Sequence, residues 1–285
     1  MNIHALQTGV VHVKADFLKG SAAAGSTLRF LARLFTDKVW VDLPIYAWVI
    51  EHDEGLIVVD TGDRADTQSN FISQSTYTIR PEEQIGAQLA RLGFSERDVA
   101  KVVLTHLHGD HINGVIDFPN TPVFLGEREY ATYRSRFGGT FVRRTTRLPG
   151  WFDPQPLLFQ AAAVGPFPQS VALTRAGDVL AVPTPGHTGG HVSVIAIKDG
   201  VHYFLAGDVT YDQAGLLAQQ LQGPSLSQPE HPRTLRRVLQ YSQTQPTVYL
   251  PAHDWESGRR LVNAEIVPHG DVVSGLNAEA QPVPA

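Results

Sequence analysis

The chain has 285 residues, of which 42% are hydrophobic and 18% are charged, and it contains no cysteine. A chain of this length can bury about 70–75% of its unfolded surface, which excludes disorder as its main state. Without cysteine it can form no disulfide, thiolate nucleophile or cysteine-ligated metal centre, so nitrogen and oxygen atoms must hold any bound metal. Its 23 basic and 28 acidic side chains give a net charge of −5. This balance, with no long basic run, favours small-molecule chemistry and argues against a nucleic-acid partner.

The N-terminal residues show no basic segment leading into an unbroken apolar stretch, and no stretch approaches ~18 apolar residues. We therefore expect a soluble, cytoplasmic protein with no membrane partner.

Short apolar segments bounded by Gly, Asp or Pro predict strands in the first half of the chain. They cover residues 10–13, 44–50, 56–59 and 102–104. Residues 81–92 predict a helix, because Pro occupies the first turn, acidic residues follow it and Gly93 ends the pattern. An apolar cluster at roughly helical spacing over residues 28–35 suits the core, a subunit contact or a substrate groove.

The second half repeats this alternation. The predicted strands are 123–125, 179–182, 192–197, 202–205 and 247–250, and the predicted helices are 127–136, 212–221 and 233–241. Residues 137–177 are rich in Gly, Pro, Arg and aromatic side chains and predict a long loop. No linker divides the chain, so we predict a single domain over residues 1–270 and a flexible tail over 271–285.

The strongest signal is the motif His-x-His-x-Asp-His, which follows the predicted strand 102–104 directly. On an extended backbone, His106 and His108 point to the same side. The glycine at 109 lets the chain turn and bring Asp110 and His111 into reach. Each pair suits one metal ion, and zinc accepts imidazole and carboxylate ligands of this kind. The motif therefore predicts a site for two metals.

Four ligands are too few for two ions, so later loops must supply the others. Three loops that each follow an apolar strand offer a suitable side chain next to Gly or Pro. These side chains are His187, Asp208 and His253.

Together, the segments THLHGDH, TPGHTGGH, AGDVTY and LPAHD resemble the metallo-β-lactamase superfamily. The resemblance implies an α/β fold, a four-layer αββα sandwich of two mixed sheets. It also implies a set of metal ligands: His106, His108 and His187 on one ion, Asp110, His111 and His253 on the other, and Asp208 bridging both. Asp60 would orient a ligand histidine, and His191 is expected to form hydrogen bonds beside the ligands rather than to bind metal.

Within this superfamily, the chain resembles the N-acyl-homoserine lactonases. It lacks the cysteine of some lactamase subclasses, and Tyr211 follows Asp208 by three residues, as a lactone-binding tyrosine does in those lactonases. The resemblance implies that a hydroxide bridging two zinc ions opens the lactone ring, a quorum-quenching reaction. Tyr211 would stabilise the oxyanion and Asp110 would transfer the proton. The acyl chain needs an apolar groove, for which the candidates are Phe30, Leu34, Phe35, Phe137, Trp151 and Phe152.

Several alternatives stay open. The same dinuclear site could hydrolyse another lactone, such as 4-pyridoxolactone, or a phosphotriester. The fold could also serve a non-catalytic protein that binds metal or senses a ligand. The nitrogen and oxygen ligands accept manganese, cobalt or iron as well as zinc, and the sequence allows a homodimer.

Overall fold

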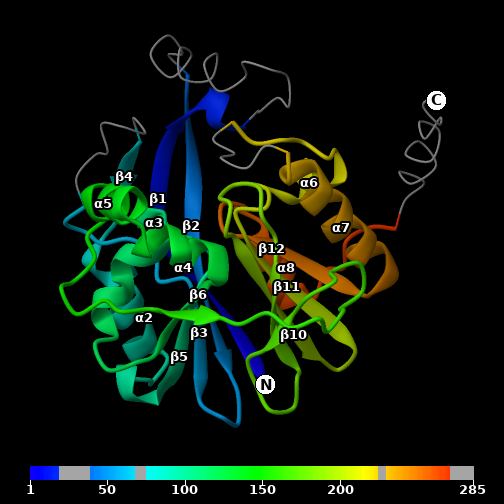
Figure 1. The fold of residues 1–285 in the computed structure, drawn as a ribbon, viewed down its shortest axis with the longest axis horizontal. Helices are drawn as coiled ribbons and strands as arrows, with labels where there is room; N and C mark the ends of the chain where they lie inside the picture. The colour runs from blue at the N-terminus through cyan, green and yellow to red at the C-terminus, as the bar shows by residue number, and fades with distance from the viewer. Residues whose placement is uncertain (19–38, 68–74, 224–228, 270–285) are drawn as a thin grey trace.

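The computed structural model describes residues 1–18, 39–67, 75–223 and 229–269. In this part of the chain, two β-sheets lie face to face, and helices cover the outer side of each sheet (Figure 1). The apolar cluster expected over residues 28–35 and the predicted tail lie outside the described residues.

The first sheet has seven strands in the order β4-β1-β2-β3-β5-β6-β7. The long strands β1 and β2 pair antiparallel, whereas β3, β5, β6 and β7 run parallel to one another. The bounds are β1 (Asn2–Lys14), β2 (Trp40–Glu51), β3 (Leu56–Val59), β4 (Thr76–Thr78), β5 (Val99–Leu104), β6 (Val123–Gly126) and β7 (Gln155–Leu157).

The second sheet has five strands in the order β12-β11-β10-β9-β8. Because β10 is antiparallel to both β9 and β11, and β12 is parallel to β11, the strands β9, β11 and β12 all end at the same edge. The bounds are β8 (Val171–Ala172), β9 (Val179–Pro183), β10 (Val192–Lys198), β11 (Val201–Gly207) and β12 (Thr247–Pro251).

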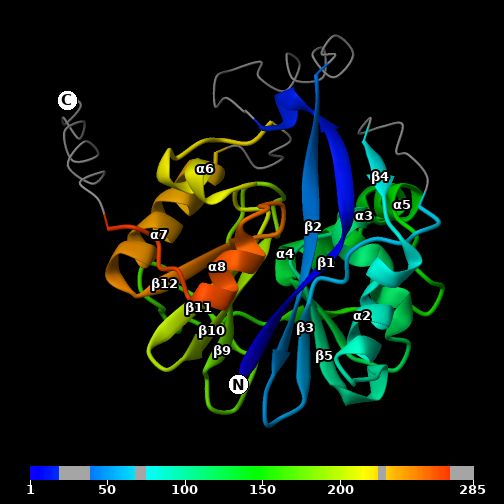
Figure 2. The same cartoon turned by 180° about the vertical axis from the view of Figure 1, so that it is seen from behind.

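Side-chain alternation in β2 shows how the layers form. Trp48 and Ile50 point into the apolar cluster between the sheets, whereas Ala47 and Val49 point into the cluster beneath the helices. A strand buried on both faces is apolar at nearly every position, as this segment is. A third cluster joins the second sheet to α6 and α7, and Figure 2 shows α7 outside β12 and α2 outside β5. The fold is thus a four-layer αββα sandwich.

The α-helices are short, and along the chain they are interspersed among the strands. Their bounds are α2 (Ile85–Arg91), α3 (Gly109–Ile112), α4 (Glu127–Arg134), α5 (Arg136–Thr145), α6 (Gln213–Leu217), α7 (His231–Thr244) and α8 (Ser257–Asn263). The 3-10 helices are η1 (Ala15–Leu18), η2 (Pro81–Glu83), η3 (Glu96–Asp98) and η4 (Asn113–Asp117). Among the described helices, none has the length and apolar character needed to cross a membrane.

The long loop predicted over residues 137–177 is wrong, because this segment contains most of α5 and the strands β7 and β8. Two glycines inside α5 argue against a helix when the sequence is read alone. In the structure, a Cβ at Gly138 would lie 2.4 Å from the carbonyl oxygen of Thr132, and one at Gly139 would lie 2.2 Å from that of Tyr133. The glycines are therefore required by the close crossing of α4 and α5. Ser135 caps α5 by accepting a hydrogen bond from the N–H of Gly138.

The helix predicted over residues 81–92 is divided into η2 and α2. The Glu83 carboxylate accepts a hydrogen bond from the N–H of Arg80 and closes a short turn, after which Gln84 has extended backbone dihedrals. Elsewhere, the predicted strand 56–59 coincides with β3, and most other predicted strands are extended by a few residues in the structure.

Candidate metal centre

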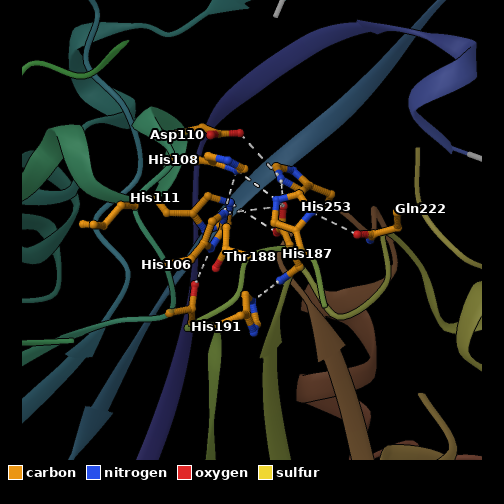
Figure 3. A network of polar contacts seen from close by, with 12 residues as sticks. His106, His108, Asp110, His111, His187, Thr188, His191, Gln222 and His253 are labelled. Carbon is orange, nitrogen blue, oxygen red and sulfur yellow. Dashed lines mark hydrogen bonds and ion pairs between the residues drawn. The ribbon is translucent and has the colours of Figure 1, made fainter. Parts of the chain in front are cut away.

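Seven predicted ligands meet at the edge where strands of both sheets end. The loop after β5 and the short helix α3 carry four of them, and the loops after β9, β11 and β12 carry one each. The structure brings together two groups that share the geometry of metal sites, namely His106, His108, His187 and Asp208, and Asp110, His111 and His253. Figure 3 shows Asp110 and the histidines of both groups pointing toward one another.

Three imidazoles converge in the first group. The Nδ1 atom of His108 lies 2.9 Å from the Nε2 atoms of both His106 and His187. A ring nitrogen that carries a proton can donate to only one of two such neighbours, so these contacts do not form a complete hydrogen-bond set. Three ring nitrogens this close together suit a divalent ion such as zinc, which takes imidazole ligands.

The carboxylate of Asp208 lies between the two groups. Its Oδ2 atom is 3.3 Å from Nε2 of His187 and 3.4 Å from Nε2 of His253. Its Oδ1 atom is 3.2 Å from Nε2 of His111. The second group is completed by Asp110, whose Oδ2 atom lies 3.6 Å from Nε2 of His253. The Asp208 carboxylate therefore lies close to histidines of both groups, as a ligand shared by two ions would.

The ligand histidines are held by their other ring nitrogen. The Nδ1 atom of His111 donates to Asp60, that of His187 to the amide oxygen of Gln222, and that of His253 to the carbonyl oxygen of Pro44. These partners can only accept, so each Nδ1 carries a proton and Nε2 is the ring nitrogen that faces the site.

Two buried atoms support the fit of these residues to a metal ion. In the described part of the chain, neither Nε2 of His111 nor Oδ1 of Asp208 has a hydrogen-bond partner, although the two atoms lie 3.2 Å apart as an ion pair. A buried polar atom without a hydrogen bond costs about 1–3 kcal/mol, and a bound ion between the two atoms would satisfy both. The nitrogen and oxygen donor set fits divalent metal.

The electrostatics of the site follow from its burial and its opposite charges. Burial alone would raise the pKa of Asp208, but the imidazoles of His253 and His111 outweigh this effect and hold the pKa well below its usual range. Burial would lower the pKa of His111, but the carboxylates of Asp208 and Asp60 raise it well above its usual value. The cluster therefore stabilises positive charge near Asp208, as a cation site must.

Asp60 and His191 lie just outside the ligands. Asp60 is 1% exposed and accepts hydrogen bonds from the backbone and hydroxyl of Thr105 and from His111. The Nε2 atom of His191 accepts from the N–H of Asp208, and its Nδ1 atom lies 2.9 Å from the hydroxyl of Thr184. His191 therefore fixes the backbone of Asp208, and both of its ring nitrogens already have a partner.

Tyr211 lies beside the ligands at the end of the loop after β11. Its ring centre is 5.6 Å from that of His253 and 6.4 Å from that of His187. Burial raises the pKa of Tyr211 well above its usual value, and the charge of Asp208 raises it further. The phenol is thus held in its protonated form, which can donate a hydrogen bond.

The residues expected to line an apolar groove for the acyl chain differ in their positions and exposure. Phe152 is buried in the core, where it packs edge-on against Tyr133, so its expected role as a groove residue is wrong. Phe137 and Trp151 are exposed. Phe30, Leu34 and Phe35 lie outside the described residues.

Sequence reasoning missed three residues that hold the ligands. Gln222 binds His187, Thr105 lies 3.0 Å from Nδ1 of His106, and the buried Glu129 binds both histidine loops. Gln222 and Glu129 are far from the ligands in sequence and carry no motif, so spacing could not reveal them. Thr105 adjoins the His-x-His-x-Asp-His motif, and its position was the one available signal.

The comparisons with known proteins agree with this geometry. The profile of the metallo-beta-lactamase superfamily matches residues 40–253. The chain is 29% identical over 220 residues to a probable metallo-hydrolase of Mycobacterium tuberculosis, which covers 72% of this chain and 67% of that protein. It is 24% identical over 265 residues to the N-acyl homoserine lactonase AttM of Agrobacterium fabrum, covering 89% of this chain and 93% of that protein.

Solved structures have the same fold. A quorum-quenching N-acyl homoserine lactone hydrolase superposes with a TM-score of 0.69 at 20% identity, covering 90% of this chain and 94% of that one. The dizinc quorum-quenching lactonase AidC superposes with a TM-score of 0.58 at 16% identity, covering 90% of this chain and 88% of that one. With a sandwich of two mixed sheets, a cluster of His and Asp ligands at its edge and a profile match over most of its length, the chain belongs to the metallo-beta-lactamase superfamily.

Proposed function

We propose that this protein is a dinuclear, zinc-dependent hydrolase that opens the lactone ring of N-acyl homoserine lactones. The observation that carries the proposal is the pair of ligand groups joined by Asp208, with the phenol of Tyr211 packed against them. The lactonase relative that aligns over 265 residues supports the substrate class. His106, His108 and His187 would hold one ion, Asp110, His111 and His253 the other, and Asp208 both.

Ions bound here would supply a nucleophile from water at neutral pH and polarise a carbonyl group. Side chains of the protein would stabilise the developing negative charge and transfer the proton. Tyr211 keeps its proton at neutral pH, so its hydroxyl can donate a hydrogen bond to the oxygen on which negative charge develops. A donor placed there acts mainly in the transition state and should raise kcat rather than lower KM.

Asp110 would move the proton. Its carboxylate lies at the edge of the second group, where its side chain is 12% exposed and Oδ2 is 3.6 Å from Nε2 of His253. From this position Oδ2 can take a proton from the tetrahedral intermediate and deliver it to the leaving ring oxygen. The product is an N-acyl hydroxy acid.

An apolar cluster of the core lies behind Tyr211. Tyr211 belongs to a buried cluster with Val11, Val13 and Ile45 of the long strands, and the partly buried Tyr77 packs against this cluster. Because these side chains are almost fully covered, they fix the ring of Tyr211 beside the candidate ligands. An acyl chain would need an apolar surface elsewhere, where it would gain about 0.8 kcal/mol for each buried methylene group.

The experiment is a titration of the acid released when the metal-loaded protein meets a long-chain N-acyl homoserine lactone, with metal content measured on the same sample. Steady acid release from protein with two zinc ions per chain is expected. No release from fully loaded protein would overturn the proposed substrate, and a parallel panel of 4-pyridoxolactone and a phosphotriester would then identify which ester is cleaved. Fewer than two ions per chain after loading would overturn the dinuclear site. The cytoplasmic location and the homodimer stay predictions.

A further inference from the structure

A buried carboxylate joins the two loops that carry the three-histidine group. Glu129 lies in the first turn of α4 and is 5% exposed. Its Oε1 atom accepts a hydrogen bond from the N–H of Leu107 at 3.2 Å. Its Oε2 atom accepts from the hydroxyl of Thr188 at 3.0 Å and from the N–H of Gly190 at 3.1 Å. Both oxygens are thus occupied by donors from two different loops.

These donors stand next to metal ligands. Leu107 separates His106 from His108, and Thr188 follows His187 directly. Figure 3 shows Thr188 beside His187. The loops belong to different sheets, since one follows β5 and the other follows β9. A carboxylate that binds both therefore controls how far the third histidine lies from the other two.

We infer that Glu129 is a positioning residue that sets the spacing of the three-histidine group, and this inference rests on the proposed metal centre. Groups that orient ligands from outside typically change metal affinity 10- to 100-fold when they are removed. Glu129 would act through the loops rather than by touching an ion or a substrate.

Close packing around Glu129 gives independent support. A Cβ at Gly190 would lie 2.1 Å from the backbone nitrogen of Glu129, and one at Gly126 would lie 2.4 Å from the carbonyl oxygen of Gly190. Real Cβ atoms do not approach so closely, so glycine alone lets the start of α4 press against this loop. The start of α4 therefore contacts this loop directly, which holds the Glu129 carboxylate against Thr188 and Gly190.

The second ligand group is held differently. His111 donates to Asp60 and His253 donates to the carbonyl oxygen of Pro44, and neither contact involves Glu129. The loss of the Glu129 carboxylate should therefore weaken one ion selectively. A residue that merely stabilised the fold would weaken both ions alike.

The substitution Glu129→Gln keeps the size of the side chain and removes one acceptor. An amide has one acceptor oxygen and one NH₂ group, whereas all three neighbours of Glu129 are donors. Whichever way the amide turns, its NH₂ group faces either Leu107 or the pair formed by Thr188 and Gly190. One of the two loops then loses its hydrogen bonding to residue 129, while the other loop keeps it.

The experiment titrates metal-free protein with Co²⁺ and Zn²⁺ against a competing chelator. In Glu129→Gln, we expect the affinity for one of the two ions to fall 10- to 100-fold, while the other changes less than about 3-fold. In the NMR spectrum of the Co²⁺ protein, the paramagnetically shifted ring N–H signals of His106, His108 and His187 should change position relative to wild type. The signals of His111 and His253 should keep their positions. This readout does not depend on any substrate.

Two further variants sharpen the test. Glu127→Gln is the matched control, because in the described part of the chain its exposed carboxylate accepts from the N–H of Phe159 and binds neither histidine loop, so both affinities should stay unchanged. Thr188→Val removes one of the three donors and should give a smaller loss at the same ion. Adding it to Glu129→Gln should cost less than the sum of the two effects. If Glu129→Gln does not fold by circular dichroism, Thr188→Val alone decides.

Wild-type affinities and spectra in Glu129→Gln would overturn the inference, and so would equal losses at both ions. Failure of the proposed metal centre would show earlier and differently, as wild-type protein that does not bind two ions. Binding of two ions by wild-type protein that has no lactonase activity would overturn the proposed substrate and leave the role of Glu129 testable by the same titration.

Discussion

Replacement of Asp60 by Asn should weaken both metal sites together. The Asp60 carboxylate accepts from Nδ1 of His111 at 2.8 Å and from the hydroxyl and N–H of Thr105 at 2.9 and 2.8 Å. The same hydroxyl lies 3.0 Å from Nδ1 of His106. Because the hydroxyl donates its proton to Asp60, it can accept from His106. One carboxylate therefore orients a histidine in each ligand group.

The size of the effect follows from what the amide cannot do. Asp60 has a φ of 58°, in the left-handed region that asparagine tolerates, so the backbone should not be strained by the change. Three donors face the carboxylate, and an amide offers only one acceptor oxygen. Loss of such an outer partner lowers metal affinity about 10- to 100-fold, or about 1.4–2.8 kcal/mol.

The assay is a Zn²⁺ titration of metal-free protein with a chelator of known affinity. Asp66→Asn is the control, since Asp66 is an exposed residue whose described ion pairs are with Arg64 and Arg147 and not with a candidate ligand. We expect Asp60→Asn to lower both affinities and Asp66→Asn to lower neither. Unchanged Zn²⁺ binding in folded Asp60→Asn would refute the reasoning that the hydrogen-bond chain holds the ligands.

Three other predictions concern catalysis, pH and packing. Tyr211→Phe should lower kcat about 100- to 1,000-fold without loss of metal, measured by steady-state kinetics and elemental analysis; metal loss would mean that the phenol is structural. Burial lowers the pKa of His191 to about 3, so below pH 6.5 only the unfolded metal-free chain protonates this ring. The free energy of unfolding, measured by urea denaturation at several pH values, should then fall toward pH 3 by up to about 1.4 kcal/mol per pH unit. In His191→Gln this fall with pH should be less steep, and an equally steep fall would contradict the reasoning. A Cβ at Gly114 would lie 2.1 Å from the carbonyl oxygen of Thr61, whereas one at Gly150 meets nothing within 4 Å. Gly114→Ala should therefore cost about 1–3 kcal/mol in chemical denaturation and Gly150→Ala almost nothing; equal costs would contradict this.

That the candidate metal ligands lie close together could be predicted from the sequence because their signal is local. His106, His108, Asp110 and His111 lie within six residues, directly after an apolar strand. The strands themselves carry continuous apolar segments, since they are buried between two layers, and β3 was predicted at its observed bounds.

The parts that escaped prediction depend on contacts between distant segments. The glycines of α5 lower its helix propensity, and only its crossing with α4 shows why they are needed. Glu129 looks like an ordinary acidic residue at a helix start until the loops around His106 and His187 are seen to meet on it. A one-dimensional pattern contains no information about which loops meet.

The position of the ligands between the sheets has a consequence for assembly of the protein. Each ligand group takes residues from both sheets, with Asp110 and His111 from the first and His253 from the second. Neither sheet alone has the full set for an ion, so metal uptake requires that the two halves are already docked. Ions that bind only this docked state should act as cross-links, raising its stability by mass action. Metal loading would then report that folding is complete.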